Sequence, residues 1–363
     1  MKTDVLIVPN DTLVLGVSNG ALGEEAVALT ARFSPSMFLE ILRDAYAAAY
    51  CAEGWHAYQA GCFSCPSHGK CDAEAVAGPR SALPSESSMR VASQLLVMGV
   101  GDRLEPLYPV PDDVLVEPGP RDAVWAQPTY LETIAQDLVQ HDMGERRLLA
   151  PSSRNLRAHD FDAYLTRKGV RVWSERKPQR LSEGEHYLPF RRLFDIESRP
   201  VQGADALGVP LCETHLRLRP GFGFLITVET PDNRPAFALP VTVAAVAGNR
   251  TLRVEHATFP QPTIDLKPRK RWRLCLLSTM FVEKGQWPPF LDGATLATRA
   301  PLPEGGKVVA FARRQSEHEL DGSVSPRSSG AGQAFIPVGT TFFIEFEEPV
   351  RIEQSAEILA GGS

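Results

Sequence analysis

The pattern of apolar and polar residues predicts strands near both ends of the chain. Residues 3–16, TDVLIVPNDTLVLG, alternate and are rich in β-branched side chains, which predicts a strand interrupted near Pro9. Residues 34–54 carry apolar side chains at helical spacing, and Pro35 suits the first turn of a helix. The apolar stripe of this predicted helix comprises Phe38, Ile41, Leu42, Ala45 and Ala49.

The pattern after this helix predicts first a long loop and then strands. Residues 54–92 have no period, residues 105–122 are proline-rich and extended, and residues 129–142 and 157–169 favour helices. Hairpins or single strands are predicted at 213–230 around Pro220-Gly221, at 237–257 around Gly248-Asn249, and at 271–282, 307–314 and 340–348. This order indicates an α+β fold with mainly antiparallel sheets.

The length of 363 residues suits two domains. We expect two ferredoxin-like (RRM-like) domains with βαββαβ order. Residues 1–258 would form the N-terminal domain, with insertions that are cysteine-rich at about 51–92 and proline-rich or helical at about 105–200. Residues 259–363 would form the C-terminal domain, with a glycine-rich loop at 321–339.

Composition narrows the class of protein. A hydrophobic content of 43% supports a folded core, and a net charge of −6 argues against a surface coated in positive charge. The N-terminus lacks the layout of a signal peptide, and no apolar tract approaches the roughly 20 residues of a membrane span. Six cysteines do not make a disulfide scaffold, so we expect a soluble, cytoplasmic protein.

Positive charge is concentrated in one region of this acidic chain. Residues 267–315 contain ten Lys or Arg against three Asp or Glu, and the segment KPRKRWRLCLLSTMFV begins this region. Arg271 and Arg273 alternate with Trp272 and Leu274, which predicts a strand with one cationic face. The alternative is a solvated strand end whose charges block edge pairing. Mobile cationic side chains and the backbone amides of glycines can bind RNA phosphates, so such residues are candidate RNA contacts. The candidates are Arg250, Lys267, Arg269, Lys270, Arg271, Arg273, Arg313, Arg314, Arg327, Gly330 and Gly332.

The segment CAEGWHAYQAGCFSCPSHGKC contains four cysteines at C-x10-C-x2-C-x5-C spacing. Four thiolates can close a tetrahedral zinc site, although this spacing matches no standard zinc module. The candidate ligands of a structural zinc are Cys51, Cys62, Cys65 and Cys71. Reduced, partly buried cysteines or a redox pair are the alternatives, whereas Cys212 and Cys275 lie in predicted strands and favour core positions.

Catalytic motifs are missing from the sequence. It has no G-x-S-x-G, P-loop, H-E-x-x-H or dinucleotide fingerprint, so we expect neither an enzyme nor a cofactor required for catalysis. The pair Asp112-Asp113 follows a proline, which favours a solvated turn over a metal site.

Several segments resemble CRISPR proteins of the RAMP superfamily, and three of these are similar to the third Cmr subunit of type III-B effectors. Residues 5–50, IVPNDTLVLG…FSPSMFLEILRDAYAAAY, resemble the superfamily's first strand and helix. The segments PLYPVPDDVLVE, RKRWRLCLLSTMFVEKGQWPPFL and GQAFIPVGTTFFIEFEE resemble elements of that subunit in the same order. This resemblance implies a non-catalytic crRNA-binding subunit that grips the 5′ repeat-derived tag and contacts the large polymerase-like subunit.

The same resemblance implies further partners and residues. The partners would include the backbone subunits of the complex, with target RNA involved indirectly and no membrane. By position, the resemblance adds Arg43 and Gly339 to the RNA-contact candidates and supports Lys270, Arg271 and Arg273.

Two other functions remain open from the sequence. The first is a CRISPR RNA-processing endoribonuclease of the same superfamily, which needs a positioned base; His56 and His68 are the histidines near the predicted first helix. The second is a zinc-stabilised protein-interaction module without an RNA role.

Overall fold

The structure of the chain is a computed structural model, and it describes some of the residues. The described residues are 1–10, 12–19, 35–51, 53, 65–78, 87–100, 103–118, 123–128, 154–166, 179–204, 210–232, 234, 237, 241–245, 250–258, 267–277, 280–283, 306–312, 333–336, 339–352 and 358–362. Among them, no helix has the length and apolar character needed to cross a membrane.

The chain folds into two compact units that each combine two separate stretches of sequence. The first unit contains residues 1–104 and 191–260, and the second contains residues 105–190 and 261–363. The last boundary lies close to the predicted one at 258. The segment 105–190 differs from the prediction, because it groups with the C-terminal stretch instead of forming an insertion in the N-terminal domain.

The first unit contains five strands of an antiparallel sheet in the order β13-β14-β1-β12-β3. These strands are β1 (Lys2–Pro9), β3 (Arg90–Val100), β12 (Phe222–Glu229), β13 (Val241–Ala245) and β14 (Arg250–His256). The predicted pair around Gly248-Asn249 is confirmed, because Val241 lies opposite Val254 and Ala245 lies opposite Arg250.

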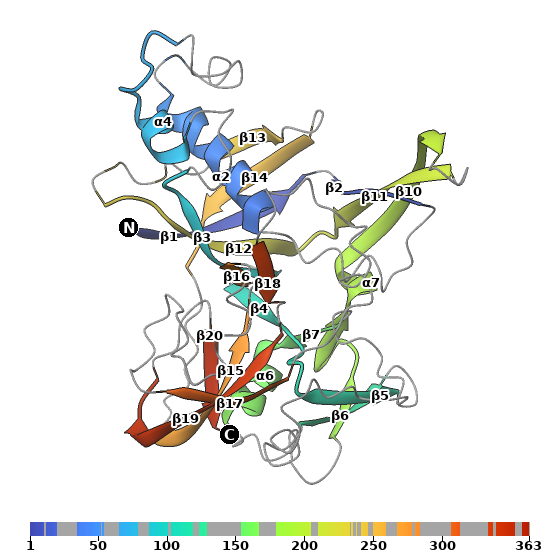
Figure 1. The fold of residues 1–363 in the computed structure, drawn as a ribbon. Coiled ribbons are helices and arrows are strands. Elements are labelled where there is room, and N and C mark those ends of the chain that lie inside the picture. Colours follow the sequence, from blue (N-terminus) through green and yellow to red (C-terminus); the bar gives the residue numbers. More distant parts are fainter. Residues whose placement is uncertain are drawn as a thin grey trace. The chain divides into compact units, whose positions relative to one another are not determined.

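Helix α2 (Pro35–Tyr50) packs against this sheet and confirms the predicted first helix. Phe38 lies with its ring centroid 5.0 Å from that of Phe224 on β12. The other stripe residues Ile41, Leu42 and Ala45 are also buried, whereas Ala49 is exposed. In Figure 1, α2 lies beside the short helix α4 (Asp72–Ala77), which falls within the predicted long loop.

A second sheet of the first unit corrects one predicted hairpin. Its order is β10-β11-β2, formed by β10 (Phe194–Ala204), β11 (Pro210–Leu218) and β2 (Leu13–Asn19), with α7 (Phe190–Leu193) just before β10. Strands β11 and β12 were predicted to pair, but they belong to different sheets. The reason is that β12 already pairs on both sides, with β1 and with β3.

The second unit contains strands that pair in the order β4-β7-β9, together with smaller antiparallel sheets. The orders of these sheets are β5-β6-β8, β17-β19-β15-β20 and β16-β18. The strands are β4 (Arg103–Pro109), β5 (Val114–Pro118), β6 (Ala123–Pro128), β7 (Arg154–Arg157), β8 (Gln179–Ser182), β9 (Tyr187–Pro189), β15 (Arg269–Leu276), β16 (Met280–Glu283), β17 (Lys307–Ala312), β18 (Gln333–Ile336), β19 (Thr341–Val350) and β20 (Ile358–Gly362). Helix α6 (Ala158–Thr166) packs against β7 and β20, as Figure 1 shows.

Both units are α+β with mainly antiparallel sheets, as predicted. The ferredoxin-like order of elements stays a prediction. The single strand expected at 271–282 is two strands, β15 and β16, which lie in different sheets. The helix predicted at 129–142 lies outside the described residues.

Gly339 joins two segments of the second unit at a buried turn. Its φ of +91° lies in the left-handed region, and its carbonyl accepts a hydrogen bond of 2.8 Å from the Asp112 amide. A Cβ at this position would lie 3.1 Å from Asp112 Oδ1 and 3.2 Å from the Val110 carbonyl oxygen.

We therefore predict that Gly339→Ala lowers the free energy of unfolding by about 2–3 kcal/mol, through backbone strain and crowding together. Gly184→Ala is the matched control in the same unit, because Gly184 has a φ of +84° and open space around its Cβ position. It should cost about 1 kcal/mol, from strain alone. If urea titrations show that the two variants lose equal free energy of unfolding, the crowding at Gly339 is contradicted.

Candidate functional site

The basic segment at the start of β15 lies along an acidic strand. Lys267, Lys270 and Arg271 are exposed, and Arg269 is half-buried. Arg271 Nε donates a 2.9 Å hydrogen bond to Glu345 on β19, and Lys270 Nζ donates to the backbone carbonyl of residue 347. The Glu345 carboxylate of β19 therefore offsets part of the positive charge that the sequence predicts here.

Arg273 lies on the same face of β15 as Arg271, but it is covered, so the predicted cationic face is not exposed at this position. Its side chain is 1% exposed, and its Nη1 lies 3.3 Å from Asp113 Oδ2. The guanidinium carbon lies 5.1 Å from the ring centroid of Tyr164 and 5.4 Å from that of Phe343. Every residue of β15 from Trp272 to Leu276 is buried. Tyr164, which lies on α6, is one of the residues that cover this part of the strand.

Asp113 is the acceptor at the centre of this buried group, which corrects the predicted solvated turn. It is 1% exposed, and its Oδ1 accepts hydrogen bonds from Tyr164 Oη at 2.6 Å and Thr341 Oγ1 at 3.2 Å. Burial, more than any neighbouring charge, raises the pKa of Tyr164 well above its usual value, so the phenol stays a proton donor to Asp113. The three segments that resemble the third Cmr subunit thus meet in the core of the second unit.

The other predicted RNA contacts differ in where they lie. Arg43 is 2% exposed within α2, and its contact with RNA stays a prediction. Gly339 is buried at the turn described above, which gives it a structural role. Arg250 begins β14. The candidates Arg313, Arg314, Arg327, Gly330 and Gly332 lie outside the described residues.

The described cysteines do not form a metal site. Cys51, Cys65 and Cys71 form no disulfide among the described residues, and Cys71 Sγ donates a weak 3.7 Å hydrogen bond to the Tyr50 carbonyl. Within the part of the chain that the structure describes, no three His, Cys, Asp or Glu side chains are placed to hold a metal ion. Cys62 lies outside that part, so the zinc site stays a prediction. Cys275 is buried as predicted, and Cys212 is half-buried.

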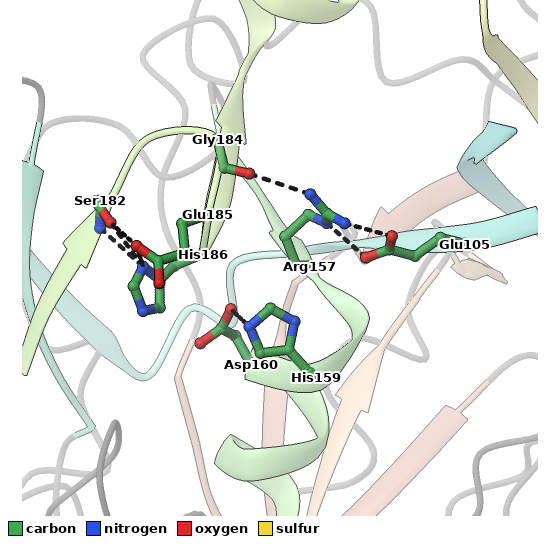
Figure 2. A network of polar contacts seen from close by, with 8 residues as sticks. All are labelled: Glu105, Arg157, His159, Asp160, Ser182, Gly184, Glu185 and His186. Carbon is green, nitrogen blue, oxygen red and sulfur yellow. Dashed lines mark hydrogen bonds and ion pairs between the residues drawn. The ribbon is translucent and has the colours of Figure 1, made fainter. Parts of the chain in front are cut away.

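A polar cluster around the start of α6 was missed by the sequence analysis (Figure 2). We call it the α6 polar cluster; its members are Glu105, Arg157, His159, Asp160, Ser182, Gly184, Glu185 and His186. Arg157 Nε and Nη2 donate to the two carboxylate oxygens of Glu105, each at 2.5 Å, and Nη1 donates to the Gly184 carbonyl at 3.1 Å. Through these contacts Arg157, the last residue of β7, joins β4 and the turn before β9.

Two imidazoles lie in the α6 polar cluster, each held by a polar neighbour. His159 Nε2 lies 2.8 Å from Asp160 Oδ2, and His186 Nδ1 lies 2.9 Å from Ser182 Oγ. The two ring centroids are 6.3 Å apart. Because the Ser182 amide also donates to His186 Nδ1 at 3.2 Å, that nitrogen acts as an acceptor and neutral His186 carries its proton on Nε2.

Burial sets the protonation of this cluster near neutral pH. Asp160 is fully buried, and loss of hydration raises the pKa of its carboxyl to about 7 against the opposing charge of Arg157. Burial also lowers the pKa of His159, with a further contribution from His186. The only local sequence signal was the adjacent pair His159-Asp160, because its partners come from residues 105 and 182–186.

Comparison with known proteins finds one family. Residues 66–359 match the model of the family described as CRISPR-associated protein (Cas_Cmr3). A comparison with curated proteins finds no match.

We predict that Arg273 is required for folding of the second unit. Arg273→Ala should lower the free energy of unfolding by about 3–5 kcal/mol, because it leaves the carboxylate of Asp113 buried without its cation. Arg271→Ala, two residues away and half exposed, should cost less than about 1 kcal/mol. Equal stabilities of the two variants in thermal or urea unfolding would contradict a structural role for Arg273.

We also predict a pH dependence that Asp160 produces. The folded carboxyl has a pKa of about 7, whereas an unfolded one has a pKa of about 4. Between these values the folded state holds a proton that the unfolded state has released. The contribution of Asp160 to the free energy of unfolding should therefore be largest near pH 4 and decline as the pH rises towards 7.

Asp160→Asn should remove this decline, which urea titrations between pH 4 and 8 would measure. Glu185→Gln is the control, because its side chain is 75% exposed and its loss should leave the decline in place. A wild-type slope that persists in Asp160→Asn would assign the pH dependence to another group.

Proposed function

We propose that the chain is the crRNA-binding structural subunit of its complex. The reason is that the chain belongs to the Cas_Cmr3 family of CRISPR-associated proteins. Family membership makes the chain a subunit of a type III Cmr effector complex. The proposal is that it grips the 5′ repeat-derived tag of the crRNA, contacts the large polymerase-like subunit and the backbone subunits, and meets target RNA only indirectly. In this function it catalyses no reaction. The match over residues 66–359 is the observation that carries the proposal.

The exposed cations before and at the start of β15 are the residues best placed to support RNA binding in the second unit. Lys267 and Lys270 are exposed, and Arg269 and Arg271 lie between and beside them. Lysine ammonium groups at the end of mobile side chains can follow phosphates without fixed geometry. Arg273 and Gly339 would act by building the strand and turn that carry these residues, rather than by touching RNA.

The α6 polar cluster favours a second candidate function, cleavage of RNA within the same superfamily. An imidazole base would take the proton of a ribose 2′-hydroxyl, whose oxygen would attack the adjacent phosphorus while a second imidazole protonates the departing 5′ oxygen. His159 and His186, with centroids 6.3 Å apart, are the specific observation for it. Incubation with repeat RNA in the absence of metal separates the functions: one clean cut would favour the enzyme, and intact RNA the binding subunit.

We predict that Lys267→Ala combined with Lys270→Ala weakens binding of crRNA by the full chain. Both side chains are exposed, so the fold should be unaffected. If both touch phosphates, the slope of log affinity against log salt should fall by about 1.4, since each contact to a single strand contributes roughly 0.7. Filter binding at several salt concentrations measures affinity and slope together.

The matched control is Lys2→Ala combined with Lys70→Ala, which removes two exposed charges from the first unit. The control should bind crRNA like the wild type. An unchanged slope in the Lys267 and Lys270 variant would rule out this end of β15 as an RNA contact.

A further inference from the structure

Four arginines gather at one place in the first unit, where the sequence analysis predicted no site. They are Arg191, Arg192, Arg217 and Arg219, and we call them the α7 arginine patch. The first two lie on α7, and the others lie at the end of β11 and just after it. Arg191, Arg192 and Arg217 are exposed, and Arg219 is half-buried.

Strand pairing brings these two stretches of sequence together. On β10 and β11, Phe194 lies opposite Leu218 and Asp195 lies opposite Arg217. One step further, the Arg219 amide donates a 2.9 Å hydrogen bond to the carbonyl of Leu193, the last residue of α7. The backbone therefore fixes the end of α7 beside the end of β11, and the four guanidinium groups start from neighbouring positions.

The carboxylates next to the patch are already engaged by arginines. Arg219 Nη2 lies 2.7 Å from Asp195 Oδ1, and Arg199 donates to both oxygens of Glu197 at 2.9 Å. The pKa of Glu197 is lowered chiefly by Arg199, with a smaller contribution from Arg217. Residues 191–195 and 217–219 contain four arginines and one carboxylate, that of Asp195, which gives these two stretches a surplus of positive charge in a chain of net charge −6. A bound anion would relieve the repulsion within this surplus.

An exposed turn with little side-chain bulk adjoins the patch. Pro220 and Gly221 are exposed, and Gly221 has a φ of +87°. Its carbonyl accepts a 2.7 Å hydrogen bond from the amide of Gly99, which is also exposed and fixes the turn against β3. A polymer backbone can approach such a turn closely, because neither glycine presents a side chain.

We infer that the α7 arginine patch binds the sugar–phosphate backbone of an RNA strand. The inference rests on the proposed function, and it adds a contact in the first unit to the one proposed at β15. Guanidinium groups pair with phosphate oxygens through two parallel hydrogen bonds, so several arginines can hold a phosphodiester chain. Contacts of this kind position the strand without reading its sequence.

Two double variants of the full chain test the inference. Arg192→Ala with Arg217→Ala removes one exposed arginine from each stretch of the patch. Arg199→Ala with Arg253→Ala is the control, because both arginines belong to the first unit, are about half exposed and pair with a nearby glutamate. Arg192→Lys with Arg217→Lys retains the charge and reports whether these positions tolerate substitution.

The probes are labelled crRNA with its repeat-derived 5′ segment and an unrelated single-stranded RNA of equal length. We expect the alanine patch variant to bind both probes roughly tenfold more weakly than the wild type, with a salt slope lower by about 1.4. The control should bind like the wild type, and the lysine variant should recover most of the affinity. Thermal unfolding of all three confirms that affinities of folded chains are compared.

The outcomes separate this inference from the proposed function. If the folded alanine patch variant keeps the RNA affinity and salt slope of the wild type while the Lys267 and Lys270 variant loses affinity, the patch alone is overturned. Absence of RNA binding by the wild type would overturn the proposed function and the patch with it. Unchanged RNA binding with lost capture of the large subunit would overturn the patch as an RNA contact and assign it to an acidic protein surface.

Discussion

The buried pair of Arg273 and Asp113 is the constraint on which the second unit depends. A guanidinium and a carboxylate lose their hydration in this core, and the loss is tolerable only when each meets its partner and the remaining oxygens are satisfied. Tyr164 and Thr341 supply donors to Asp113, and the neighbouring Asp112 amide bonds to Gly339. The two charges can therefore be buried only when the segments near residues 113, 164, 273 and 341 pack together.

Because of this constraint, part of the motifs that resemble Cmr proteins has a structural role. Residues that looked like RNA contacts because they are basic or flexible, Arg273 and Gly339, serve the packing of strands and turns. Exposed cations lie elsewhere, at the start of β15 and in the α7 arginine patch. The division is physical: a cation inside the core must be neutralised by its own protein, whereas a cation at the surface can exchange counterions for a phosphate.

The α6 polar cluster illustrates a third use of polar side chains. Arg157 and Glu105 join two strands through a bidentate pair, while buried Asp160 sits beside His159 with its pKa raised to about 7. Strong structural pairs and groups that change protonation near neutral pH thus occur side by side. The second kind makes stability depend on pH near neutrality, because the folded and unfolded states bind different numbers of protons in that range.

The sequence by itself determined the elements whose pattern is local. The break between β1 and β2, the helix α2 with its buried stripe, the β13–β14 pair and the antiparallel α+β class all follow from residues that are neighbours in the chain. Only the tertiary structure decided that β11 and β12 enter different sheets, that residues 105–190 join the C-terminal unit, and that Arg271 is exposed while Arg273 is buried. The physical reason is that pairing partners and burial are set by surfaces contributed from distant segments, such as Asp113 for Arg273 and Leu193 for Arg219, and a local pattern does not contain those surfaces.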